Sequence, residues 1–149
     1  MVDPMTVIST ISAGLNLVDK FTDIVGKLRR KAPKAHSVQA TQEASALVIR
    51  RDGAVAETVS SGSIHLNEWD ATRYQALEGK VKSLWTQFNA LDAQLPTLAI
   101  DEKVRIEQKM ETMRKDLCGS FKQMIDIYEK TLGTSLGDHY SLYQTCSDS

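Results

Sequence analysis

NEWDATRYQALEGKVKSLWTQFNALDAQLPTLAIDEKVRIEQKMETMRKDLCGSFKQMIDIYEKTLG, residues 67–133, has apolar side chains at helical spacing on both sides of one proline. Before Pro96 they recur at alternating steps of three and four residues, the heptad pattern of a helix that packs along its length against one neighbouring helix. Asn67 is a suitable N-cap and Pro96 ends the run, so we expect a helix from residue 67 to about residue 94. Its seam consists of Tyr74, Leu77, Val81, Leu84, Phe88, Leu91 and Leu95.

A second helix is predicted from Asp101 to about Leu132, because acidic residues suit the first turn of a helix and Gly133 suits the C′ position. Its apolar residues include an eleven-residue repeat, which favours a nearly straight helix in a bundle over a long two-stranded coiled coil. The loop between the two helices is short, so we expect an antiparallel helical hairpin. The second seam consists of Ile106, Met110, Met113, Leu117, Phe121, Met124, Tyr128 and Leu132.

A third amphipathic helix is predicted from Met5 to Lys31, ahead of this hairpin. Pro4 suits its first turn and Pro33 ends it, since proline lacks the N–H that a helix interior requires. Gly14 and Gly26 weaken it by about 1 kcal/mol each relative to alanine. One face of this helix is apolar and consists of Ile8, Ile11, Leu15, Val18, Phe21, Val25 and Leu28.

A β-hairpin is predicted between the first and second helices. Two runs rich in β-branched residues, 46–51 and 54–59, flank Asp52-Gly53, a pair typical of a type I′ turn. The competing interpretation is a helix over residues 42–51, and residues 32–45 are expected to be a linker. Because a two-stranded hairpin is marginal in water, it needs a third strand, from 38–41 or 64–66, or else its edges are open to a partner.

The expected fold is therefore mainly α: an elongated bundle of three long helices of matched length, with a β-hairpin insertion. We divide the chain into an amphipathic N-terminal helix with a basic end (1–34), a linker with the hairpin (35–66), the antiparallel helical hairpin (67–133) and a partly disordered tail (134–149). The apolar fraction of 42% and charged fraction of 25% are those of a globular protein.

Charge is distributed unevenly along the chain. The net charge is −1, but residues 1–34 hold six basic and three acidic side chains, a balance of +3. Nucleic acid is an unlikely partner, because neither the net charge nor any extended basic and aromatic pattern favours it. A contact with lipid or another anionic partner is the functional interpretation of the basic cluster, against an ordinary solvated helix end. The cluster consists of Lys27, Arg29, Arg30, Lys31 and Lys34.

The sequence contains no motif for catalysis, a cofactor or a metal. Its three histidines, His36, His65 and His139, lie in different segments, and no phosphate-binding glycine motif occurs. A hydrolase built on Cys118 and His139 is a distant possibility. Two cysteines without a C-x-x-C pair favour a reducing, cytoplasmic location, although Cys118 and Cys146 could pair if the tail folds back.

We therefore expect a non-enzymatic module for protein–protein interaction or oligomerisation, which acts through its helical apolar seams. The partner is another protein or a second copy of the chain, and no cofactor or small-molecule substrate is expected. The alternative is a membrane-active effector or peripheral membrane protein that uses the N-terminal helix and its basic cluster. A structural helix should tolerate replacement of these cations by glutamine, whereas a lipid anchor should not.

Overall fold

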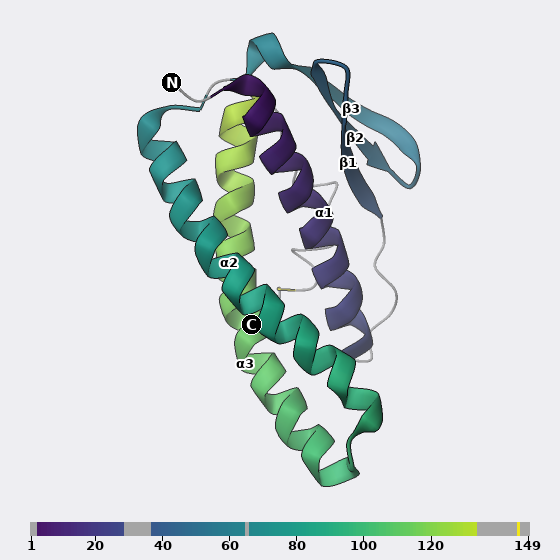
Figure 1. Ribbon diagram of the computed structural model, residues 1–149. Coiled ribbons are helices and arrows are strands. Elements are labelled where there is room, and N and C mark those ends of the chain that lie inside the picture. The colour runs from purple at the N-terminus through teal and green to yellow at the C-terminus, as the bar shows by residue number, and fades with distance from the viewer. Residues whose placement is uncertain (1–2, 29–36, 65, 134–145, 147–149) are drawn as a thin grey trace.

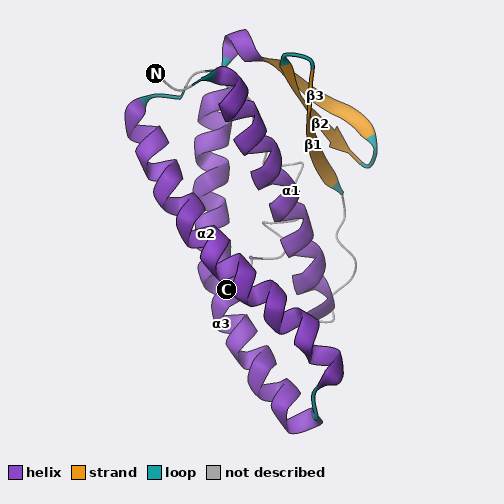
Figure 2. Ribbon diagram, in the orientation of Figure 1, coloured by secondary structure: helices purple, strands orange, loops and turns teal. Residues whose placement is uncertain are grey.

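The computed structural model describes residues 3–28, 37–64, 66–133 and 146 of the chain. The part of the chain it describes is mainly helical, with three long helices and a small antiparallel sheet between the first and second (Figures 1 and 2). The elements follow in the order α1 (Pro4–Leu28), β1 (Val38–Glu43), β2 (Ala46–Arg51), β3 (Ala54–Ser60), α2 (Glu68–Gln94) and α3 (Ile100–Leu132). Short 3-10 turns, Ser61–Ser63 and Leu95–Thr97, precede and follow α2.

Helices α2 and α3 form the antiparallel pair predicted from their short connection. The Asn67 side chain caps α2 by accepting a hydrogen bond from the N–H of Asp70 at 2.8 Å. Gly133 ends α3 with φ at 71°, a left-handed conformation that glycine adopts without strain. Helix α3 begins at Ile100, one residue earlier than the acidic first turn suggested. The Lys80 Nζ and the Asp116 carboxylate, 3.1 Å apart, link the two helices.

Helix α1 lies between the α2–α3 hairpin and the sheet (Figure 1). Its apolar face is buried in one continuous core with the other helices, and the ring of Phe21 is the clearest junction. That ring lies 5.7 Å from the ring of Phe88 on α2 and 5.0 Å from the ring of Phe121 on α3, between centroids. The predicted apolar face of α1 is thus confirmed as a core face from Ile8 to Val25, and the side chain of Leu28 lies outside what the structure describes.

The sheet has three strands in the order β1-β2-β3, so the predicted hairpin gains a third strand. Asp52 and Gly53 have φ angles of 54° and 85°, as a type I′ turn requires. The competing interpretation, a helix over residues 42–51, is wrong, because these residues belong to strands β1 and β2. The expected linker 32–45 contains β1, which includes the candidate third strand 38–41. Val38 and Ala40 alternate with exposed residues in β1, and their burial against α1 stabilises a strand whose composition is mostly polar.

Polar side chains of α1 cover the outer edge of β1. Asn16 Oδ1 accepts from the N–H of Ala40 at 2.8 Å, while its Nδ2 donates to the Ala40 carbonyl at 2.9 Å. The Ser12 hydroxyl donates to the same carbonyl at 2.7 Å, and Asp19 Oδ1 accepts from the N–H of Val38 at 3.0 Å. The steps of four and three place these side chains on one face of α1. They pair backbone groups that an edge strand would otherwise leave open.

The helices are not of matched length. At about 1.5 Å per residue, the 25 residues of α1 span about 38 Å and the 33 residues of α3 about 50 Å. The far end of the α2–α3 hairpin therefore continues beyond the end of α1, as Figure 1 shows. This end of the hairpin includes the turn from Leu95 to Thr97.

Gly14 of α1 lies against the side chain of Tyr128 on α3. A Cβ atom at Gly14 would overlap the hydroxyl of Tyr128, whereas a Cβ atom at Gly26, in the same helix, would meet no atom within 4 Å. We predict that Gly14→Ala lowers the free energy of unfolding by about 1–3 kcal/mol, because the overlap forces side chains or backbone to shift. Gly26→Ala is the matched control and should raise it by about 0.5–1 kcal/mol through helix propensity. Urea denaturation measures both, and equal effects would contradict the close approach.

Candidate functional site

The predicted seam residues pack mostly inside the chain itself. Three of the twelve proposed as interface residues, Leu77, Leu84 and Leu91, are half-buried. The remaining nine are buried: Tyr74, Val81, Phe88, Met110, Met113, Leu117, Phe121, Met124 and Tyr128. The seams therefore hold α2, α3 and α1 together, and in this conformation most of their length is not accessible to a partner.

Of the four large apolar side chains that are exposed in the described residues, two lie at the end of the hairpin beyond α1; the other two are Val55 in β3 and Trp69 in the first turn of α2. Ile100 is 79% exposed and Val104 is 51% exposed. They are four residues apart and thus neighbours on the surface of α3. We call the apolar residues of this end the apolar tip; it comprises Ile100 and Val104 with the half-buried Leu91, Leu95 and Ile106. Large exposed aliphatic side chains that cluster on a surface are typical of interaction sites.

A buried tyrosine pair joins α2 to α3 at the opposite end of the hairpin. The hydroxyls of Tyr74 and Tyr128 lie 2.8 Å apart, and the ring centroids are 5.5 Å apart. Burial raises the pKa of the Tyr74 hydroxyl well above its ordinary value, and the Glu78 carboxylate raises it further. The Tyr74 hydroxyl therefore keeps its proton at neutral pH and acts as a hydrogen-bonding group rather than as a base.

Asp70 is a buried carboxylate at the same end. Its side chain is 5% exposed and lies 2.8 Å from the Lys130 Nζ of α3 and 3.9 Å from Arg73. The hydrogen bond from Lys130 lowers the pKa of Asp70, with a smaller contribution from Asn67. The carboxylate is therefore charged at neutral pH and fixes the start of α2 against the end of α3. No sequence pattern predicts this ion pair, since the pairing of residues 70 and 130 depends on the register of the hairpin.

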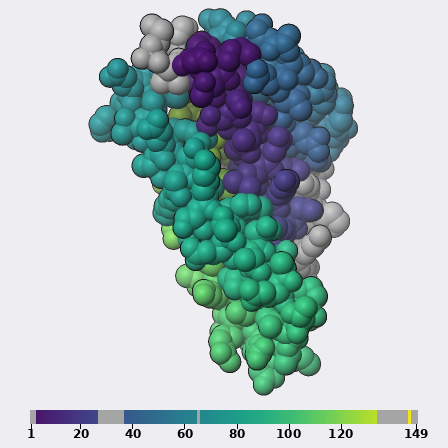
Figure 3. All heavy atoms as spheres, viewed as in Figure 1, coloured from purple at the N-terminus to yellow at the C-terminus, as the bar shows by residue number. Residues whose placement is uncertain are grey.

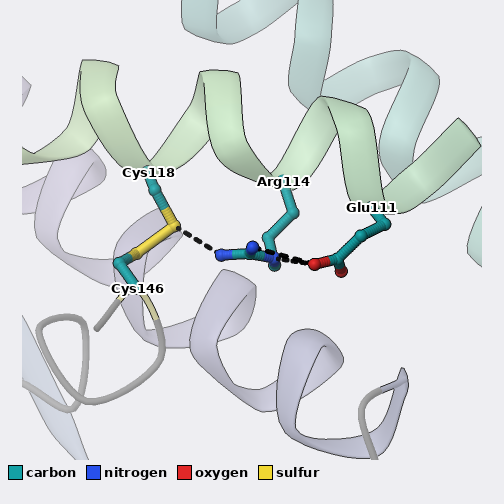
Figure 4. The surroundings of a disulfide bond; sticks show 4 residues. All are labelled: Glu111, Arg114, Cys118 and Cys146. Carbon is teal, nitrogen blue, oxygen red and sulfur yellow. Dashed lines mark hydrogen bonds and ion pairs between the residues drawn. A yellow bond between two sulfur atoms is a disulfide. The ribbon is translucent and has the colours of Figure 1, made fainter. Parts of the chain in front are cut away.

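The Cys118–Cys146 disulfide, which the sequence left open, is present in the structure. Beside it lies Arg114, a fully buried cation (Figure 4). Arg114 Nη2 and Nε lie 2.8 and 3.0 Å from Glu111 Oε1, and Nη1 lies 3.6 Å from Cys118 Sγ. Arg114 was not among the predicted site residues, although the spacing of Glu111, Arg114 and Cys118 places all three on one face of α3. A disulfide sulfur has no thiol proton, so in this state Cys118 is not a nucleophile.

Several predicted residues lie outside the described residues. Arg29, Arg30, Lys31 and Lys34 are among them, and of Lys27 the structure describes the helical backbone alone. His36, His65 and His139 also lie outside. Within the ranges described, no three His, Cys, Asp or Glu side chains are grouped closely enough to hold a metal ion.

Comparison with known proteins adds no assignment. No family model, curated protein or solved structure matches the chain. Among the helices of the described segments, none is both long enough and apolar enough to span a bilayer.

We predict that Cys146→Ser lowers the free energy of unfolding by about 2–4 kcal/mol, because the disulfide closes a loop across a sequence separation of 28 residues. The measurement is urea unfolding under non-reducing conditions. The wild-type chain in excess dithiothreitol is the control and should match the variant. A variant as stable as the oxidised wild type would show that the two sulfurs are not bonded in solution.

Proposed function

We propose that this protein is a non-enzymatic interaction module that self-associates through the apolar tip of its α2–α3 hairpin. The exposure of Ile100 and Val104, on a hairpin end that α1 does not cover, is the observation that carries the proposal. The proposed partner is a second copy of the chain. In a dimer with two-fold symmetry the same surface patch is used by both chains, so the apolar tip of each chain is buried. The proposal requires no cofactor.

The energetics of the tip favour association. Removing a large aliphatic side chain from water contributes about 1.5–3 kcal/mol when burial is complete. Asp101, Glu102, Lys103 and Arg105 lie between and beside the apolar residues and supply both signs of charge. A small apolar centre with a charged rim is the usual arrangement of an interface between separately folded chains.

We expect the double variant Ile100→Lys/Val104→Lys to be monomeric at concentrations at which the wild type forms dimers. Each substitution replaces a buried apolar side chain of the interface by a charged one, and the lost burial should raise the dissociation constant at least about tenfold. Sedimentation equilibrium measures the dissociation constants, and circular dichroism checks the fold.

The matched control is Thr112→Lys/Gln123→Lys, which adds two lysines at exposed positions of the same helix away from the tip. It should dimerise like the wild type. A wild-type chain that remains monomeric, or a control variant that loses association equally, would contradict the proposal.

The alternative proposal is a peripheral membrane protein that uses the basic cluster at the end of α1. The apolar face of α1 is buried in the core, with Ile8, Leu15, Val18 and Phe21 each at 0% exposure. An amphipathic α1 would therefore have to leave the core before lying on a bilayer, so the basic cluster alone would make the first contact. The cytoplasmic location expected from the sequence stays a proposal. The Cys118–Cys146 disulfide favours a different location, an oxidising compartment.

Co-flotation with phosphatidylserine vesicles tests the alternative. If the basic cluster binds lipid, replacing Lys27, Arg29, Arg30 and Lys31 by glutamine should abolish flotation at low salt. The control replaces four other cations, Lys103, Arg105, Lys109 and Lys115, by glutamine and should leave flotation unchanged. A wild-type chain that does not float would exclude the alternative.

A further inference from the structure

A cleft opens between α1 and α2 at the end of the molecule away from the apolar tip. Its volume is about 230 Å³. The space-filling view shows it as a hollow between the purple and teal surfaces, with atoms of α3 at its base (Figure 3). A closed apolar cavity of about 150 Å³ can hold benzene. The cleft is therefore large enough for an aromatic ring with a short side chain.

Apolar and polar side chains both line the cleft. Ile11 of α1 and Ile127 of α3 supply apolar surface, while Thr10 and Glu78 supply polar groups from α1 and α2. A pocket that combines apolar lining with a few polar groups is the usual form of a small-ligand site.

The base of the cleft is held in a single arrangement. Tyr74 and Tyr128 both line it, and their hydroxyls are hydrogen-bonded to each other at 2.8 Å. Gly14 provides the room for the Tyr128 hydroxyl against α1. Because the rings are buried and paired, the cleft does not have to form when a ligand arrives, which reduces the entropic cost of binding.

Glu78 determines the charge that the cleft prefers. Of the described residues that line it, Glu78 alone is ionisable at neutral pH, and no lysine or arginine is among them. Its carboxylate forms an ion pair with the Nζ of Lys82, which lies 3.2 Å from Oε1 on a side chain that is 72% exposed. An exposed pair four residues apart on a helix is weak, so a ligand cation can compete with Lys82 for the carboxylate.

We propose that this cleft is a binding site for a small organic amine, with its apolar body between Ile11 and Ile127 and its ammonium group at Glu78. The site lies at the opposite end of the hairpin from the apolar tip and is independent of self-association. Thr10 also lines the cleft, and its hydroxyl can hydrogen-bond a second polar group of the ligand.

Three probes with the same ring and different head groups test the charge preference: 2-phenylethylamine, 2-phenylethanol and phenylacetate. Chemical shifts of the backbone amides that line the cleft report binding in a titration of the full, oxidised chain. We expect a Kd on the order of 1 mM for the amine, as befits so small a ligand. The alcohol should bind about tenfold more weakly and phenylacetate more weakly still.

Two variants separate the contributions of charge and shape. Glu78→Gln should bring the amine and the alcohol within about twofold of each other, because the ion pair contributes the tenfold difference. Ala71→Leu places a larger side chain in the cleft and should abolish shifts by both probes while the thermal midpoint stays at or above that of the wild type. Glu102→Gln, a carboxylate near the tip, is the control and should change neither affinity.

The proposal is overturned if no probe shifts the cleft amides up to about 20 mM, a concentration well above the expected Kd. It is also overturned if phenylacetate binds as well as the amine, or if folded Ala71→Leu still binds. None of these outcomes depends on whether the chain forms dimers.

Discussion

The position of α1 between two layers is the constraint on which the rest of the structure depends. Its apolar face packs against α2 and α3 through residues such as Phe21, while Ser12, Asn16 and Asp19 satisfy the backbone of β1. A three-stranded sheet of this size has little core of its own. Without α1, the sheet would lose both its covered face and its covered edge, and the hairpin would expose its seams.

Helix α3 is buried by several other parts of the chain. Towards its C-terminal end it is buried by α1 and α2 as well as by Cys146, so that residues outside the predicted seam, such as Ile125 and Ile127, are also buried. Arg114 is tolerated there because its guanidinium bonds Glu111, whose carboxylate is 38% exposed and still reaches water. A buried cation with no such partner would be strongly destabilising.

The two ends of the hairpin offer different surfaces. At the tip, α1 has ended, so Ile100 and Val104 are exposed and suited to a flat contact with a second chain. At the other end three helices converge on Tyr74 and Tyr128 and leave a concave surface instead. The difference in helix length and the close approach at Gly14 thus account for both proposed sites.

Local patterns in the sequence were sufficient to predict the helices, their caps at Asn67 and Gly133, and the Asp52-Gly53 turn, because these depend on neighbouring residues alone. For the third strand, local patterns left a choice between residues 38–41 and 64–66, and the Asp70–Lys130 pair, the buried Arg114 and the cleft could not be predicted in this way. Each depends on which distant segments meet: β1 is a strand because α1 buries Ala40, and the tip is exposed because α1 ends before it. The sequence by itself determined the helices and strands and their apolar faces. The tertiary structure decided which of those faces the chain buries and which remain exposed to water. The reason is that burial depends on packing between segments distant in sequence.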